Sequence, residues 1–252
     1  MKIKYSILSR GTEKYVGHGY MAISEPKNGK QYIFDLDHNI LDTNEIKNKL
    51  SFPSNFSINN IVFSRFELIS ELLFRRVLIQ DNILICGLGS VGIACLINLL
   101  EHGYKKIFIY SKNPFHNLEL IEKMYDVKLM QVDKIDDSYK SYIELTGDSL
   151  VLKKIIESVS SLKDIVILST PRDQNYFIDP LTINRKNLTI YGGHELIGYS
   201  DEFRNNVFSD LLRSNTKIEN LIKHFISFHN FSSKKLEELL NKKENYIDVF
   251  KY

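Results

Sequence analysis

The pattern of hydrophobic and polar positions changes at about residue 78. From there on, short runs of β-branched and aliphatic residues alternate with amphipathic stretches of helical length. This alternation is typical of βαβ units around a parallel sheet. It predicts helices at 91–102, 116–125 and 149–161, and strands at 82–86, 106–110, 128–132, 141–145, 165–169 and 188–191. The predicted fold class is therefore α/β, with a doubly wound parallel sheet of the Rossmann type.

The residues on either side of this region have a different texture. The N-terminal part predicts a helix at 64–78, after a loop that contains Pro53, and short strands at 3–8, 19–24 and 31–36. Beyond Gly193 we expect one or two helices, including 234–240, and an extended run at 246–252. We assign residues 1–76 to a small β-rich domain, residues 77–220 to a dinucleotide-binding domain, and residues 221–252 to a return into the first domain.

Composition limits the partners of the chain. Its 252 residues include 33 basic and 31 acidic side chains, a balance that argues against nucleic-acid or membrane partners and favours a small-molecule substrate. No apolar run has the length of a signal peptide or a membrane span, which predicts a cytoplasmic protein. The two cysteines, Cys86 and Cys95, are expected to be small core residues, because no second pair exists to form a zinc cluster.

A glycine-rich segment stands between the first predicted strand and helix of the sheet domain. In this G-x-G-x-x-G pattern, Gly87 allows a tight turn, Gly89 lets the backbone approach a pyrophosphate, and Gly92 allows close helix–sheet packing. Ser90 and Val91 would present N–H groups at the positive end of the helix dipole. The segment predicts a dinucleotide-binding loop, and the alternative is a glycine turn without a ligand.

The end of the second strand bears on which dinucleotide binds. An acidic residue there would bind the ribose of NAD and repel a 2′-phosphate. Here Ser111 and Lys112 stand nineteen and twenty residues after Gly92 (111 − 92 and 112 − 92), and they offer a hydroxyl and a positive charge instead. We therefore expect NADP(H) rather than NAD. The alternative is that Lys112 is only a solvated surface lysine.

With these segments placed, the chain resembles the medium-chain dehydrogenase/reductase superfamily, the zinc alcohol dehydrogenase-like proteins. The segments 142–147, 166–171 and 188–193 look like the later Rossmann strands of that family, and the resemblance places Ser169 and Thr170 at the cofactor. It also implies a truncated GroES-like domain formed by both termini. Because relatives extend their sheets across a two-fold axis, it implies a homodimer joined through the strand at 188–193.

The resemblance further implies a member without zinc. The segment 7–13 looks like the catalytic loop of the family, but Arg10 stands where a zinc-binding Cys normally stands. His18 matches the zinc-binding His, and the third ligand has no counterpart in the segment 60–63. Catalytic zinc needs three protein ligands, so we expect no metal.

Without zinc, a side chain must supply the proton that accompanies hydride transfer. The candidates are His38, which follows a predicted strand, Thr12, which matches the hydroxyl of the family's proton relay, and His18. Of these, we expect His38 to be the proton donor, with Thr12 as a relay. For each, a structural role is the alternative. Arg10 is expected either to anchor an anionic group or to pair with Glu13.

The sequence thus predicts an NADPH-dependent, zinc-independent oxidoreductase that acts on a small carbonyl or alcohol substrate. Two alternatives stay open. One is a reductase of an activated C=C or C=N bond, such as a dehydroamino acid in natural-product tailoring. The other is a catalytically silent protein that only binds the cofactor.

Overall fold

The computed structural model describes residues 1–16, 21–44, 47–112, 117–170, 178–241 and 247–252. The chain forms two compact units. Unit 1 comprises Met1–Leu68 and Glu195–Tyr252, and unit 2 comprises Ile69–His194. Helix α2 (Ile58–Phe74) begins in the first and ends in the second.

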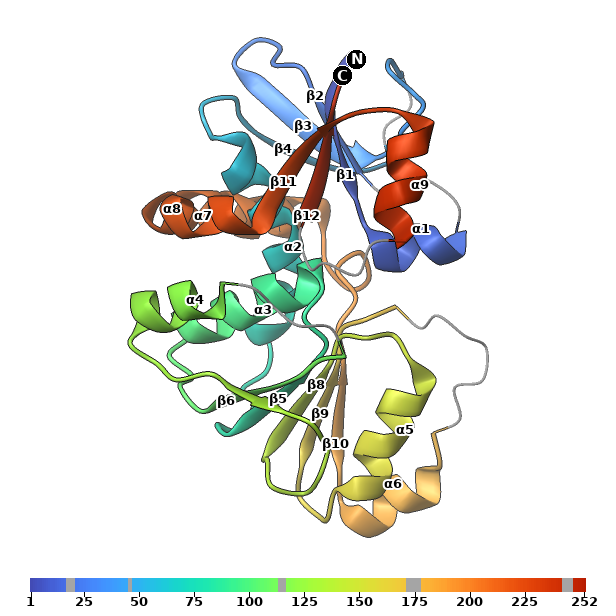
Figure 1. Cartoon of the computed structure of the whole chain (residues 1–252), viewed down its shortest axis with the longest axis vertical. Helices are drawn as coiled ribbons and strands as arrows, with labels where there is room; N and C mark the ends of the chain where they lie inside the picture. Colours follow the sequence, from blue (N-terminus) through green and yellow to red (C-terminus); the bar gives the residue numbers. More distant parts are fainter. Residues whose placement is uncertain (17–20, 45–46, 113–116, 171–177, 242–246) are drawn as a thin grey trace. The chain divides into compact units, whose positions relative to one another are not determined.

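Unit 2 contains a six-stranded sheet in which every neighbouring pair is parallel (Figure 1). Its order is β10-β9-β8-β5-β6-β7. The strands are β5 (Ile83–Cys86), β6 (Ile107–Tyr110), β7 (Met130–Val132), β8 (Ser141–Glu144), β9 (Asp164–Ile167) and β10 (Thr189–Gly192). The chain runs outward from β5 toward β7 and then resumes at β8, on the other side of β5. This reversal creates a switch point between β5 and β8, the place where doubly wound sheets bind ligands.

Helices cover both faces of this sheet. In Figure 1, α3 (Ser90–Glu101) and α4 (Leu118–Tyr125) lie on one face, and α5 (Ser149–Ser158) and α6 (Pro180–Lys186) lie on the other. All four residues of β5 are buried, because helices cover both faces of the sheet. In α3, the nine residues from Gly92 to Leu100 are buried as well. On the opposite face, Ile155 of α5 packs in one cluster with Leu84, Tyr142 and Ile165 of the strands. The predicted Rossmann-type sheet is confirmed.

Unit 1 contains a separate six-stranded sheet with the order β11-β12-β1-β2-β3-β4. Its strands are β1 (Ile3–Leu8), β2 (Met21–Ser24), β3 (Lys30–Asp35), β4 (Lys47–Pro53), β11 (Ile226–Asn230) and β12 (Ile247–Lys251). Neighbouring strands are antiparallel except for the parallel pair β11–β12. Because β1 pairs with β12, segments near both ends of the chain complete one sheet, as the sequence predicts for the small β-rich domain.

The helices of unit 1 are α1 (Arg10–Val16), α7 (Asp201–Asn215), α8 (Glu219–Ile222) and α9 (Ser233–Asn241). Two short 3₁₀ turns, Thr216–Ile218 and Lys223–Phe225, flank α8. The sequence predicts α9 and β12 but not α1, β4, α6 or β11. It also places the start of α2 at Ser64, whereas this helix begins at Ile58.

The chain returns to unit 1 earlier than the expected boundary at residue 221. Helix α7 belongs to unit 1 because it packs against β4, and its Asn215 donates hydrogen bonds to Ser64 and Glu67 in the part of α2 that lies in unit 1. Asn205 Oδ1 accepts a hydrogen bond from the Ser51 N–H at 2.7 Å, and the rings of Phe52 and Phe208 meet edge to face. These contacts fix α7 on the small sheet.

Candidate cofactor site

The loop between β5 and α3 has the geometry that its glycines predict. Gly87 adopts a φ of +102°, which side chains rarely allow, and a Cβ there would lie 3.0 Å from Cγ2 of Thr146. Its N–H donates to the Tyr110 carbonyl at 2.8 Å, which ties the loop to the end of β6. A Cβ at Gly92 would collide with the carbonyl oxygen of Gly87. Gly87 and Gly92 therefore allow the chain to fold back tightly on itself.

Gly89 has a different environment. It is the N-cap residue of α3, and no side chain caps the helix there. A Cβ at Gly89 would meet no atom of the described chain within 4 Å. Ser90 and Val91 follow in the first turn, where N–H groups point out of the helix at the positive end of its dipole. The space above Gly89 thus suits an anion that approaches the backbone closely, as a pyrophosphate does.

The segment after β6 lies at the carboxyl ends of the strands, as the glycine loop does. Cys86 and Tyr110 are partners in the parallel ladder, so Ser111 and Lys112 emerge beside the glycine loop. The Lys112 side chain is 72% exposed, and its Nζ lies 3.4 Å from Oδ2 of Asp148, whose side chain is 33% exposed. Such a pair between exposed groups is weak. A phosphate would therefore find the ammonium group accessible.

The residues at the carboxyl ends of β8 and β9 lie at the same end of the sheet. Glu144, the last residue of β8, accepts hydrogen bonds from Thr146, Gly147 and Ser169. Thr170 is exposed next to Ser169. Burial raises the pKa of the Cys86 thiol, with a further contribution from Glu144, so Cys86 does not offer a thiolate to a ligand here. Glu144 was not predicted from the sequence, although an acidic residue at the end of a buried strand was a usable signal.

The candidate catalytic residues lie in unit 1. Thr12 is in the first turns of α1, half-buried, and its hydroxyl accepts a hydrogen bond from Ser9 Oγ at 3.1 Å. Because Ser9 donates, this bond leaves the hydroxyl proton of Thr12 available. His18 lies outside the described residues.

His38 is 1% exposed, and both of its ring nitrogens have partners. Nδ1 hydrogen-bonds Ser6 Oγ, and Nε2 hydrogen-bonds Oε2 of Glu13, both at 2.7 Å. The Tyr252 hydroxyl donates to the His38 carbonyl at 2.6 Å and lies 2.7 Å from Ser6 Oγ. Because the hydroxyl proton of Tyr252 is used in the bond to the His38 carbonyl, Ser6 must be the donor in its bond with Tyr252. Nδ1 of His38 must then donate to the Ser6 oxygen. The remaining contact then requires one proton between Nε2 of His38 and Glu13.

A second charged cluster joins the start of α1 to β12. Arg10 forms an ion pair with Asp248 of β12, and His229 Nε2 hydrogen-bonds the other oxygen of Asp248 at 2.8 Å. Arg10 therefore pairs with Asp248, whereas Glu13, the partner considered from the sequence, bonds His38. Together the two clusters fasten α1, and Thr12 with it, to the sheet of unit 1. That His38 itself donates a proton to a substrate stays a prediction.

In the described part of the chain, no group of three or more His, Cys, Asp or Glu side chains is arranged to hold a metal ion. None of the helices described is long and apolar enough to cross a membrane. The absence of zinc, the cytoplasmic location and the homodimer stay predictions. For the dimer, β10 does lie at an edge of its sheet.

Comparison of the sequence alone gives nothing, because no protein-family model and no curated protein matches it. The structure does have similar solved structures. S. aureus TarJ is 16% identical with a TM-score of 0.72, and the match covers 99% of this chain and 89% of that one. Galactitol-1-phosphate dehydrogenase from Escherichia coli is 12% identical with a TM-score of 0.71, covering 100% and 91%. The yhdH oxidoreductase from Salmonella enterica, solved in complex with NADP, is 14% identical with a TM-score of 0.70, covering 100% and 90%.

These structures are members of one superfamily. This chain has the medium-chain dehydrogenase/reductase fold. The resemblance inferred from the sequence is thereby confirmed at the level of the fold. The medium-chain dehydrogenase/reductase fold accounts for both sheets, including the one that the two ends of the chain complete.

Proposed function

We propose that the chain is an NADP(H)-dependent oxidoreductase that reduces a small carbonyl substrate, or oxidises the corresponding alcohol, without zinc. The observation that carries the proposal is the glycine loop at the switch point of a parallel sheet. There Gly87 and Gly92 close the turn and Gly89 leaves open space at the N-terminus of a twelve-residue helix. This is an arrangement that a pyrophosphate fits. Several solved structures of the same fold are dehydrogenases. The yhdH oxidoreductase was solved with NADP and S. aureus TarJ with NADPH, whereas Bacillus subtilis yhfP was solved with NAD.

The residues present suit the larger of the two nicotinamide dinucleotides. The N–H groups of the first turn of α3, from Ser90 onward, would hold the pyrophosphate. Ser111 and Lys112 would hold the 2′-phosphate. Among the described residues, Lys112 has a weak, exposed contact with Asp148, which a phosphate could replace. Bound in this way, NADPH supplies the hydride.

The other half of the chemistry falls to this chain's own side chains. A carbonyl oxygen that gains a hydride at its carbon needs a proton. The hydroxyl of Thr12 is half-buried and keeps its proton available, which supports it as the group that meets the substrate oxygen. His38 and Glu13 share one proton beneath α1 and hold that helix in place. In place of His38, the donor predicted from the sequence, we therefore propose Thr12 as the proton donor and His38 as a positioning residue.

Titration of NADPH and NADH by fluorescence tests the cofactor assignment. Lys112→Ala should weaken NADPH by about ten- to a hundredfold, because a charge-assisted phosphate contact contributes about 1.5–3 kcal/mol. NADH should be unaffected. Lys153→Ala is the matched control, because Lys153 is also an exposed lysine with one weak carboxylate contact, 3.7 Å from Glu157. Equal affinities of the native chain for both dinucleotides, or no loss in Lys112→Ala, would refute the NADP(H) assignment.

A further inference from the structure

Glu144 is a fully buried carboxylate that the chemistry above does not use. It is 0% exposed at the carboxyl end of β8. An acidic side chain is rarely buried unless hydrogen bonds satisfy it. Here Oε1 accepts from the Thr146 N–H at 2.6 Å, from the Thr146 hydroxyl and from the Gly147 N–H at 3.0 Å, while Oε2 accepts from the Ser169 hydroxyl. One side chain thus joins the segments that follow two adjacent strands.

The first consequence concerns the loop after β8. Thr146 donates its hydroxyl proton to Glu144 and accepts from the Asp148 N–H at 3.1 Å, so this hydroxyl is used within the loop. Its methyl group is the atom nearest to the Cβ position of Gly87, at 3.0 Å. Glu144 therefore holds Thr146 against the glycine loop and fixes where Asp148, the contact of Lys112, begins α5.

The second consequence concerns Ser169. A serine hydroxyl has one proton and two lone pairs. An ionised carboxylate only accepts, so the proton of Ser169 is committed to Glu144 and its oxygen is left to accept. Phosphate oxygens also only accept, so they are not suitable partners for Ser169 in this state. A ribose hydroxyl or the carboxamide N–H of nicotinamide is suitable.

We propose that Glu144 is a positioning residue for the dinucleotide. It accepts hydrogen bonds from the hydroxyls of Thr146 and Ser169, and this leaves the Ser169 oxygen as an acceptor for a hydroxyl or amide donor of the cofactor. This inference rests on the proposed function. It differs from the role of Lys112, because a donor of this kind is present in both NADPH and NADH. A change at Glu144 should therefore weaken both dinucleotides, whereas a change at Lys112 should weaken only NADPH.

Glu144→Gln is the informative substitution. The amide keeps one oxygen for the Thr146 and Gly147 donors but places an N–H against Ser169, whose hydroxyl must then turn its proton away from residue 144. We expect NADPH and NADH to bind about tenfold more weakly, because the Ser169 hydroxyl would then present a donor where the cofactor needs an acceptor. Ser169→Ala should cost a similar factor. The double variant should be no weaker than either single variant, because both changes remove the same contact.

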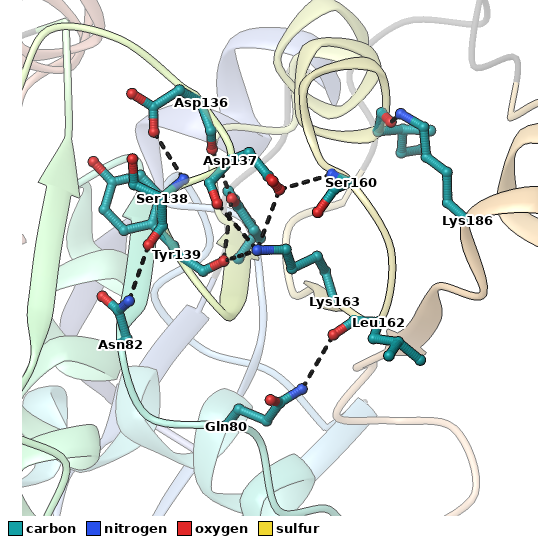
Figure 2. Close-up of polar contacts among 12 residues, drawn as sticks. Gln80, Asn82, Asp136, Asp137, Ser138, Tyr139, Ser160, Leu162, Lys163 and Lys186 are labelled. Carbon is teal, nitrogen blue, oxygen red and sulfur yellow. Dashed lines mark hydrogen bonds and ion pairs between the residues drawn. The ribbon is translucent and has the colours of Figure 1, made fainter.

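The amino end of the same sheet supplies a control for loss of stability alone. Figure 2 shows the Nζ of Lys163, just before β9, donating to the carbonyls of Asp137 and Tyr139, at 3.0 and 2.7 Å. Its side chain is 7% exposed, and it also forms an ion pair with Asp137 at 3.2 Å. Lys163→Met should destabilise unit 2, and the change lies at the amino ends of the strands, away from Glu144 at their carboxyl ends. It should leave the affinity for both dinucleotides unchanged.

Dissociation constants are measured well below the melting temperature of each variant, from the fluorescence of NADPH and NADH and, for 2′-phospho-ADP-ribose, from its displacement of bound NADPH. If the Glu144→Gln loss is the same with 2′-phospho-ADP-ribose, the donor is a ribose hydroxyl. If the loss disappears with that probe, the donor is the carboxamide. Should Glu144→Gln not fold, Thr146→Val removes one of the four bonds with little change of shape and should weaken both dinucleotides.

The two proposals fail in distinguishable ways. A native chain that binds neither dinucleotide would overturn the proposed function. A native chain that binds NADPH, with a Glu144→Gln variant that binds both dinucleotides as tightly as Lys163→Met does, would overturn only the role of Glu144. Additive losses in the double variant with Ser169→Ala would also overturn it.

Discussion

The substitution Gly89→Ala should weaken dinucleotide binding while leaving the folding stability of the glycine loop nearly unchanged. Gly89 has a φ of −76° and a ψ of −168°, which alanine also adopts. Its Cβ would meet no atom of the described chain within 4 Å. The cost to the free protein is then the loss of a favourable N-cap residue, about 1 kcal/mol or less. For a chain of this length that corresponds to a fall in melting temperature of about 2–4 °C.

The cost to the bound state is larger. The methyl group of Gly89→Ala occupies the open space that a pyrophosphate would enter, and it holds the phosphate away from the N–H groups of the first turn. Losing one charge-assisted contact costs about 1.5–3 kcal/mol, or about ten- to a hundredfold in affinity. We expect this loss with both NADPH and NADH, because both contain the pyrophosphate.

Gly92→Ala is the matched comparison. A Cβ at Gly92 collides with the backbone oxygen of Gly87, which no side-chain movement relieves. Overpacking of this kind costs about 1–3 kcal/mol, so this variant should lose stability as well as affinity. Thermal unfolding and dinucleotide titration of both variants provide the measurement. If Gly89→Ala binds NADPH within about twofold of the native chain, a change below 0.5 kcal/mol, the pyrophosphate does not lie on this loop.

Two further predictions concern His102, which is partly exposed, and His38, which is buried. Bonding to Glu71 raises the pKa of His102, and although burial acts to raise that of Glu71, its bonds to His102 and Arg75 hold its pKa below the ordinary value. The stabilising contribution of this pair is therefore full between the ordinary pKa values of 4.5 and 6.5, and it is lost as the pH rises through the raised pKa of His102 or falls through the lowered pKa of Glu71. His102→Gln should thus cost more free energy of unfolding at about pH 5.5 than at about pH 8.5, by less than about 1 kcal/mol because the pair is partly exposed; an equal cost at both would contradict the assignment. His38→Ala should lower the melting temperature, since Glu13 and Ser6 each lose a buried partner worth about 1–3 kcal/mol, while NADPH titration should give an unchanged affinity; an unchanged melting temperature would show that the network does not stabilise unit 1.

The sequence predicted unit 2 well because its signals are local. The central strands β5, β8 and β9 are almost fully buried, because helices cover both faces of the sheet, and α3, α4 and α5 each have their own helical periodicity. The glycine loop was predicted for the same reason, since the turn, the open N-cap and the close packing each require glycine at one position. The position of Lys112 then follows from the pairing of β5 with β6.

The elements missed in unit 1 depend on contacts between distant segments. The strand β4 is mostly exposed and ends in Pro53, so its pairing with β3 is not visible as an alternating pattern. Helix α1 is seven residues long and was interpreted as a loop. Its start had a local signal, because Glu13 accepts from the Ser9 N–H at 2.8 Å and satisfies a donor at the helix start.

The roles of the candidate side chains were the least predictable part. The sequence marked His38 as a titratable group near a strand end, but it did not reveal that Glu13 and Ser6 occupy both ring nitrogens. Asp248, the partner of Arg10, is 238 positions away. Such pairings follow from the register of β1 with β12, which no local pattern specifies.

That register also has a consequence for the order in which the protein can fold during synthesis. Tyr5 pairs with Lys251, so at about 5–20 residues per second the first strand waits roughly 12–50 s for its neighbour to leave the ribosome. The residues of unit 2 are contiguous, and all of them have been synthesised before α7 and β12 are made. We expect the dinucleotide-binding unit to fold first, while β1 keeps one unpaired edge that is open to other chains. A bound dinucleotide would then stabilise this early unit before the residues that face the substrate exist in folded form.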